Sequence, residues 1–370
     1  MRRLPALVAA LLLPAAQPVL LSTAFSTATL LVSEAAAQTQ SSVDALLEKA
    51  RALHGKKGSE REMIKLSNQV LAIRQSADAY FYRAYAKSDL GDKHGAIADF
   101  NQAIAINPKD ADAYYNRGVA KSDLGDQQGA IADYTQAIAI NPQDADTYKN
   151  RGFAKSDLGD QQGAIADYSQ AIAINPKDAE AYNNRGVAKY DLGDTQEAIV
   201  DYNQAIVINP KDAEAYNNRG VARYDLGDKQ EAIADYNQAI TVNPQYANSY
   251  YNRGLAKSAL GDQQGAIADY SQAIAINPRY ARAFIARGIA RSDLGDKQGA
   301  IADFNQAIVI NPKNALAHKT RGIALEETGD IYRACKDWRV AASLGDLDAA
   351  DWVRRQCQQI AFAHTLKPLP

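Results

Sequence analysis

The sequence predicts an all-α solenoid, a stack of antiparallel helix pairs, and not a globular domain with one core. An Asn-Pro pair closes a segment of 34 residues and recurs at that spacing along the chain. The prolines are Pro108, Pro142, Pro176, Pro210, Pro244, Pro278 and Pro312. A Gly-Asp pair recurs at the same interval, from Gly91-Asp92 to Gly329-Asp330. Each predicted helix has about three turns and is too short to be stable alone, so packing must hold the stack together.

Composition and charge argue against several classes of function. The chain has 41 basic and 43 acidic residues, without a basic stripe or an acidic block, which argues against nucleic-acid binding. The 4 histidines are scattered, and no metal-ligand spacing, Gly-rich phosphate loop or nucleophile elbow is present. Catalysis normally breaks a repeat at one place, and only the ends of this array differ. We therefore expect no enzyme activity, no metal site and no cofactor.

The first 37 residues have the composition of a secretory signal peptide. Arg2 and Arg3 precede an apolar run that begins at Leu4, and three alanines end at Ala37, before Gln38. This pattern predicts that residues 1–37 are a signal and that the protein is exported, to the periplasm or the extracellular space. The alternative is an uncleaved membrane anchor over residues 4–32 that faces outside the cytoplasm. Prolines at positions 5, 14 and 18 weaken that span.

Residues 77–346 contain about eight repeats, and Ala113–Pro142 shows how each one is built. Gly125 is suited to end the first helix in a left-handed conformation, and Asp126 is suited to cap the second. The closing proline cannot continue that helix. In two copies the cap Asp is followed three residues later by Glu, which predicts capping boxes. These pairs are Asp194 with Glu197 and Asp228 with Glu231.

Small and aromatic residues also recur in fixed columns. Gly118, Ala130 and Ala137 are small, which allows two helices to approach closely, and Tyr114 and Tyr134 fill the space beside them. The second aromatic column ends in Phe304 and Trp338, so size is kept while identity changes. These columns predict a packed core between helices.

The pattern resembles the tetratricopeptide repeat (TPR) family over residues 77–348. The family signature falls on Tyr114, Gly118, Ala130, Tyr134, Ala137 and Pro142. Arg117 and Lys121 depart from it, because the family has Leu and Tyr at those places, and both departures repeat along the array. The resemblance implies a right-handed solenoid whose first helices line a concave face, and it implies a protein-interaction scaffold.

The flanks of the array are expected to be caps. Residues 38–76 indicate a degenerate helical pair, with apolar positions such as Leu46, Leu53, Met63 and Val70. Residues 347–370 indicate a capping helix and a tail, and counting in steps of 34 places Trp352 in the aromatic column of a ninth first helix. Terminal repeats need a more polar outer face, so such divergence is typical of solenoids.

Two charged columns are present in all eight units and predict an ion-pair ladder. The basic column is Arg83, Arg117, Arg151, Arg185, Arg219, Arg253, Arg287 and Arg321. The acidic column is Asp99, Asp133, Asp167, Asp201, Asp235, Asp269, Asp303 and Asp337. An anion-binding track along the Arg column is the functional alternative, but matched Asp residues would neutralise it. We interpret the ladder as structural.

A column of asparagines is the main candidate for partner binding. It consists of Asn116, Asn150, Asn184, Asn218 and Asn252. The other units lack an amide there, so packing alone does not require one. Some members of the family carry an Asn ladder on the concave face that grips an extended peptide, and an amide offers both donors and an acceptor. The alternative is that each Asn only bonds the backbone of a neighbouring unit.

Positions beside the Asn column vary and are predicted to set partner preference. The residue before each Asn changes along the array, as in Tyr115, Lys149 and Tyr251, and Phe153 stands three residues after one Asn. An acidic column either favours basic partners or is a solvated helix end. Its members are Asp123, Asp157, Asp191 and Asp225.

The 2 cysteines are expected to meet at the C-terminal end of the stack. Cys335 replaces an Ile column that faces the following unit, and Cys357 lies on the predicted capping helix. We predict a structural disulfide, which persists in exported proteins, and two small buried thiols are the alternative.

These observations together predict an exported, non-catalytic scaffold that holds an extended segment of a protein or peptide partner. The alternative is a membrane-anchored spacer or assembly factor that positions a membrane-associated complex. The sequence does not identify the partner.

Overall fold

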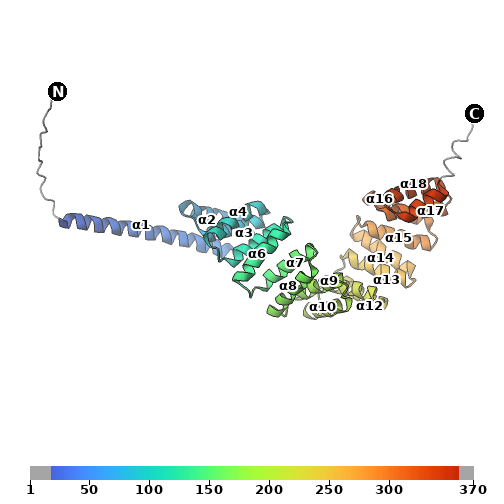
Figure 1. Cartoon of the computed structure of the whole chain (residues 1–370), viewed down its shortest axis with the longest axis horizontal. Coiled ribbons are helices and arrows are strands. Elements are labelled where there is room, and N and C mark those ends of the chain that lie inside the picture. The colour runs from blue at the N-terminus through green and yellow to red at the C-terminus, as the bar shows by residue number, and fades with distance from the viewer. Residues whose placement is uncertain (1–17, 358–370) are drawn as a thin grey trace, which may run out of the picture. The chain divides into compact units, whose positions relative to one another are not determined.

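The computed structural model describes residues 18–357, with side chains from residue 32 onward, and within them the chain forms helices and no strand. Contacts divide the chain after Pro142 into two compact units. Figure 1 shows the helices as successive antiparallel pairs within each unit. The predicted all-α solenoid is confirmed.

The first unit contains six helices. They are α1 (Pro18–Leu53), α2 (Glu60–Ile73), α3 (Ala77–Asp89), α4 (Lys93–Ile106), α5 (Ala111–Asp123) and α6 (Gln127–Ile140). The C-terminal part of α1 packs on α2 through Val43, Ala50, Met63 and Val70, which are at most 1% exposed. The side chains of residues 32–42 in α1 are exposed, and the helix passes the predicted cleavage position without a break.

The first 17 residues of the predicted signal lie outside the described residues. Among the helices that are described, a search for a segment long and apolar enough to cross a bilayer found none.

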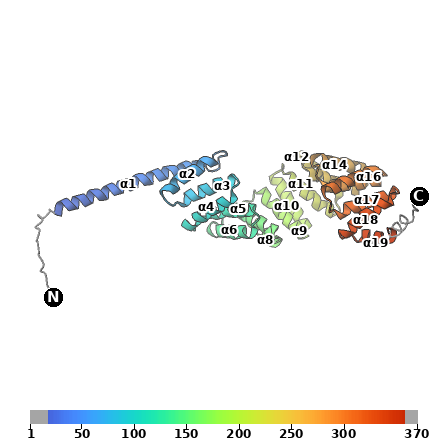
Figure 2. The same ribbon diagram turned by 90° about the horizontal axis from the view of Figure 1, so that it is seen from above.

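The second unit contains thirteen helices. They are α7 (Ala145–Asp157), α8 (Gln161–Ile174), α9 (Ala179–Asp191), α10 (Thr195–Ile208), α11 (Ala213–Asp225), α12 (Lys229–Val242), α13 (Ala247–Ala259), α14 (Gln263–Ile276), α15 (Ala281–Asp293), α16 (Lys297–Ile310), α17 (Ala315–Glu327), α18 (Ile331–Ser343) and α19 (Leu347–Gln356). Figure 2 shows the same pairs from another side, with α19 next to α18.

The turn between the paired helices of every repeat contains a glycine with positive φ before the Asp, as predicted. Gly125 has φ +83°, a conformation that residues with a Cβ rarely adopt, and Asp126 accepts a hydrogen bond from the Gly129 N–H at 2.9 Å. The predicted capping boxes are not formed as expected, because Asp194 and Asp228 make no side-chain cap bond. A Cβ at Gly129 would lie 2.1 Å from Asp126 Oδ2, so a Glu at this position is incompatible with the same Asp rotamer.

The core lies between paired helices and follows the predicted small and aromatic columns. A Cβ added to Gly254 in α13 would lie 2.5 Å from the ring of Tyr270 in α14, so only glycine permits this approach. Tyr270 is 1% exposed and packs on Ala266 and Ala290. The aromatic column is therefore core, as the sequence indicated.

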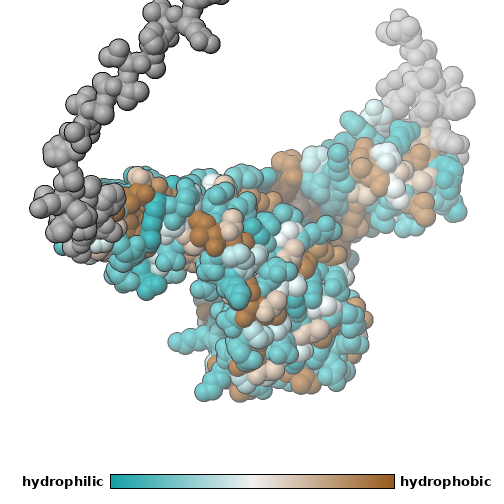
Figure 3. Space-filling model, turned by 60° about the vertical axis from the view of Figure 1, so that its left-hand side comes forward, coloured by the Kyte–Doolittle hydropathy of each residue, from teal (hydrophilic) through white to brown (hydrophobic). Residues whose placement is uncertain are grey.

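First helices of successive repeats contact one another in the second unit. These contacts run from α7 to α9, α9 to α11, α11 to α13, α13 to α15 and α15 to α17, while each second helix packs on the first helix of the next repeat. We call the solvent-facing residues of α7, α9, α11, α13, α15 and α17 the inner face. The space-filling view in Figure 3 shows apolar residues scattered in small groups among hydrophilic ones on the face that it presents.

A disulfide closes the C-terminal end, as predicted. Cys335 in α18 and Cys357, just after α19, form the bond and are 2% and 0% exposed. Beside it the rings of Trp338 and Trp352 lie 5.3 Å apart. A cross-link of this loop length stabilises the fold by about 3 kcal/mol, so it fastens the last helix to the stack.

Candidate inner-face binding site

The Arg and Asp columns form ion pairs inside each repeat and are not free to bind a partner. In the second unit Arg219 donates through Nε and Nη2 to Asp235, which is 3% exposed, and Arg223 Nη1 donates to the same carboxylate at 2.7 Å. Arg219 Nη1 also donates to Asn203 Oδ1 of the preceding second helix at 2.7 Å. The predicted ion-pair ladder is confirmed, and the Asn contact links it to the neighbouring repeat.

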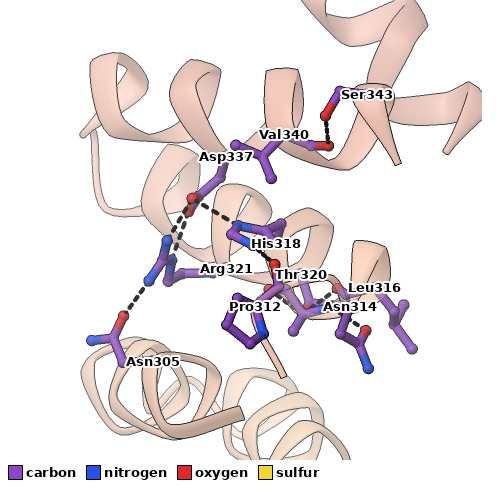
Figure 4. A network of polar contacts seen from close by, with 11 residues as sticks. Asn305, Pro312, Asn314, Leu316, His318, Thr320, Arg321, Asp337, Val340 and Ser343 are labelled. Atoms are coloured by element: carbon purple, nitrogen blue, oxygen red, sulfur yellow. Dashed lines mark hydrogen bonds and ion pairs between the residues drawn. The ribbon is translucent and has the colours of Figure 1, made fainter. Parts of the chain in front are cut away.

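The last repeat shows a variant of this network (Figure 4). Arg321 donates to Asp337 and to Asn305, while His318 Nδ1 lies 3.3 Å from Asp337 and His318 Nε2 lies 3.1 Å from the Pro312 carbonyl oxygen. Two parts of this network were not predicted from the sequence. One is the second basic side chain that pairs with the Asp of the earlier repeats, such as Arg223, and the other is the acceptor on the preceding second helix, such as Asn203. The second cation recurs every 34 residues from Lys87 to Arg291, and the acceptor column alternates between Asn203-type amides and the hydroxyls of Ser169 and Ser271, so the same period contains the signal that would have revealed them.

The asparagine column of the second unit bonds partly to neighbouring repeats. Asn218 Nδ2 donates to Asn183 Oδ1 at 3.1 Å, and Asn252 Nδ2 donates to Asn217 Oδ1 at 3.0 Å. Asn183 and Asn217 are 4% and 6% exposed, so these neighbours of the column are buried acceptors and not surface residues. Asn252 donates one N–H in this way, and an amide has a second N–H and a carbonyl oxygen for other partners.

The remaining members of the column differ from this arrangement. Asn218 and Asn252 each donate to the residue 35 positions earlier in the chain. For Asn184 that residue is Lys149, and its ammonium group accepts no hydrogen bond. Asn150 is half-buried in α7. In the first unit, Asn116 Nδ2 donates to the Asp112 carbonyl oxygen of its own helix at 2.8 Å.

Lys149 is engaged inside the second unit. Its ammonium lies 3.3 Å from Asp146, 3.1 Å from Asp178 and 2.9 Å from Glu180. Burial alone would lower the pKa of Lys149, but hydrogen bonds to Glu180 and Asp178 raise it above its usual value. Lys149 thus connects α7 to the start of α9.

The other predicted site residues lie on first helices. Phe153 in α7 is 50% exposed, which leaves its ring available to a partner. Tyr115 in α5 of the first unit is half-buried, with its ring 6.0 Å from that of Tyr134. The predicted acidic column is partly occupied, since Asp191 accepts from Gln161 at 3.2 Å and Asp225 accepts from the Tyr190 hydroxyl.

Tyr251 lies in a hollow that the sequence did not reveal. The hollow has a volume of about 460 Å³. Its lining includes Tyr251, Leu255, Ile285, Ile289, Arg282 and Leu316, from α13, α15 and α17. A second hollow of about 660 Å³ shares Tyr251 and Arg282 and adds Asn252 and Asn314. The sequence does contain a signal for both hollows. The first-helix positions that hold Arg282 and Leu316 hold Glu180 and Glu214 in earlier repeats, and the residue type changes after the fifth repeat.

Carboxylates gather at the start of the first helices in α9 and α11. Burial, and then the charge of Asp212, raise the pKa of Glu214, and the charge of Glu180 adds to this effect. These acids therefore lie close enough to repel one another. No group of three or more potential metal-ligating side chains was found among residues 18–357.

Comparison with solved structures identifies the architecture. A tetratricopeptide repeat protein from Parabacteroides merdae ATCC 43184 is 22% identical, covers 68% of this chain and 99% of its own, and has a TM-score of 0.56, which shows the fold. The Cut9–Hcn1 structure of the APC/C is 17% identical over 81% of this chain and 60% of its own, with a TM-score of 0.54. MamA is 32% identical over 44% of this chain and 96% of its own, with a TM-score of 0.41. No match was found among curated proteins.

Family descriptions match along most of the array. One described as TPR repeat matches residues 84–125, 156–193 and 188–227. Two described as Tetratricopeptide repeat match residues 111–144, 213–246 and 247–280, and residues 281–314. The matches share the 34-residue period and the paired helices already described, and together they span more than half of the chain. The chain therefore belongs to the tetratricopeptide repeat family.

Proposed function

We propose that this protein is a non-catalytic interaction scaffold whose inner face in the second unit holds an extended segment of a protein partner. The observation that carries the proposal is the row of half-buried amides, Asn150, Asn184, Asn218 and Asn252, on successive first helices. Such amides offer hydrogen bonds to a main chain without selecting a side chain. The exposed ring of Phe153 adds apolar contact beside the row.

Rigidity of the stack favours this mode of binding. The buried ion pairs and the aromatic core fix each first helix against its partner, and each second helix fixes the next repeat. A surface that is ordered in advance loses little conformational entropy when a partner binds, so more of the contact energy becomes affinity.

We also propose that the protein works outside the cytoplasm. The buried Cys335–Cys357 disulfide supports this location, because such bonds persist in oxidising compartments. The alternative, a spacer on an uncleaved anchor, is favoured by one observation, namely that α1 runs as one helix from residue 18 to residue 53.

The test is a pull-down from the exporting compartment with three versions of the full chain. The first is wild type, and the second replaces all five asparagines of the column by alanine. The third is a matched control that replaces exposed valines on second helices by serine. The changes in the control are Val200→Ser, Val207→Ser and Val309→Ser, at positions 57%, 72% and 73% exposed.

We expect wild type and the control to retain the same defined protein and the alanine variant to lose it. Each lost hydrogen bond costs about 1 kcal/mol, so two or more losses weaken binding by more than about tenfold. Circular dichroism must show equal helicity and melting beforehand, because Asn218 and Asn252 also bond between repeats. Retention of the partner by the alanine variant would place binding elsewhere and contradict the proposal.

A further inference from the structure

The repeat symmetry of the second unit is broken at the start of its first helices. In α7, α9 and α11 the cap and the second helical residue are both acidic, as in Asp178 with Glu180 and Asp212 with Glu214. In the next three first helices, none of these positions is acidic. The later pairs are Tyr246 with Asn248, Tyr280 with Arg282, and Asn314 with Leu316. The inner face therefore changes from acidic to aromatic, apolar and basic between α11 and α13.

The replaced residues build the hollow described above. The rings of Tyr251 and Tyr280 lie 5.1 Å apart, and the Tyr280 hydroxyl donates to Asn248 Oδ1 at 3.0 Å. Burial raises the pKa of Tyr280 to about 12, and the charge of Arg282 opposes this rise. Arg282 lines both hollows, the first together with Tyr251 and the second together with Tyr251 and Tyr280.

The floor of the hollow is apolar and partly open to solvent. Ile285 is 5% exposed, while Ile289 and Leu316 are 39% and 45% exposed. At the position of Ile285 the repeats containing α9 and α11 have Asn183 and Asn217, so the floor is less polar here than in those two repeats. A floor of this kind favours a bulky aliphatic or aromatic side chain, because it removes apolar surface from water.

Arg282 gives the hollow its charge preference. It is exposed and forms no salt bridge with any residue between 32 and 357, although two other cations of the same helix, Arg287 and Arg291, are paired with Asp303. An unpaired guanidinium beside an apolar hollow complements a carboxylate and can bind it through two parallel hydrogen bonds.

We propose that this hollow binds a short element of the partner segment that contains a bulky apolar or aromatic residue and a neighbouring Asp or Glu. The apolar side chain fills the space between Tyr251, Ile285 and Leu316, and the carboxylate pairs with Arg282. This inference rests on the proposed function, since the element is part of the extended segment that the asparagine row holds.

The chain itself supplies the variant that tests the charge contact. Arg282→Glu introduces the residue found at the equivalent positions 180 and 214, so the helix start is expected to fold normally. Lys177→Glu is the matched control, because it makes the same charge change at an exposed position of another repeat. Leu316→Glu places a charge in the apolar floor.

The probe is a fluorescein-labelled ten-residue peptide, Gly-Ser-rich, with Phe-Glu at its centre, measured by fluorescence anisotropy against the full chain. Companion peptides carry Ala-Glu, Phe-Gln or Phe-Lys at the centre. We expect wild type and Lys177→Glu to bind the Phe-Glu peptide at least about tenfold more tightly than the companions. Arg282→Glu should lose this preference and favour the Phe-Lys peptide, and Leu316→Glu should weaken binding of every Phe-containing peptide.

Several results would overturn the inference. Absence of Phe-Glu binding, or an unchanged preference in Arg282→Glu, would exclude the charge contact. Binding seen only after removal of residues 358–370 would make the tail of this chain the occupant. Self-association that Arg282→Glu abolishes would make a second copy the occupant. If the pull-down loses its partner in the asparagine variant but keeps it in Arg282→Glu and Leu316→Glu, this inference fails while the proposed function stands.

Discussion

Replacing Asp235 by Asn is expected to lower the free energy of unfolding of the second unit by about 3–5 kcal/mol. The Asp235 carboxylate is 3% exposed and accepts hydrogen bonds from both Arg219 and Arg223. Asparagine has nearly the same shape as aspartate but carries no charge. Its NH2 group is a donor, so it cannot accept the hydrogen bond from one of the two guanidinium groups. Removal of the carboxylate leaves two partly buried cations without compensation, which costs more than the intact pairs contribute.

Urea unfolding followed by circular dichroism measures this loss. The matched control is Asp293→Asn, because Asp293 is exposed at the end of α15 and its change is expected to stay within about 0.5 kcal/mol. A cost below about 1 kcal/mol for Asp235→Asn would mean that the buried ladder contributes little and would contradict its structural role.

The second large effect is a loss of stability at alkaline pH. Tyr168, Tyr202, Tyr236 and Tyr270 are at most 2% exposed, and burial, the first cause in each case, raises their pKa well above the usual value of about 10. Above about pH 10 the unfolded chain releases these protons while the folded chain keeps them. The contribution of these tyrosines to the free energy of unfolding is therefore fully present below about pH 10 and is lost as the pH rises above it.

As the pH rises well above about 10, the slope is expected to approach about 1.4 kcal/mol per pH unit for each tyrosine, or about 5.5 kcal/mol per pH unit for the four together. Urea midpoints between pH 9 and pH 11 measure it. The matched variant changes all four residues to Phe, which Phe100 and Phe304 already show to fit the column at 0% and 1% exposure. Lysine titration affects both proteins equally, so the same slope in both would show that the buried tyrosines do not cause it.

The sequence predicts local features well, because each depends on residues close together or on the period. The Gly125 turn, the small and aromatic columns, the Arg–Asp pairs and the disulfide all follow from spacing alone, since each pairing repeats or lies at the end of a repeat. The stack could be derived in the same way, because helix pairs of this length are stable only when neighbours cover them.

The partner-binding candidates were harder to place. Lys149 and Asn217 occupy positions whose residue type varies along the array, and variation alone does not tell a free side chain from one that bonds the next repeat. The prediction of capping boxes was wrong because a Cβ at the third helical residue would clash with the cap Asp in the rotamer that bonds the helix. The division after Pro142 depends on contacts between repeats, which near-identical sequences do not reveal.

The central claim is that partners bind on first helices of the second unit, and site-specific photo-crosslinking tests it most directly. Benzoylphenylalanine is placed singly at Phe153 or Ile289 on first helices, or at Val207 or Val309 on second helices. The chain is irradiated in the compartment proposed for it above. Phe153 and Ile289 are 50% and 39% exposed, and the two valines are more exposed, at 72% and 73%. Exposure alone would therefore favour the second helices. We predict that the same partner is cross-linked from positions 153 and 289 and not from 207 or 309. Cross-linking from the valine positions alone would contradict it.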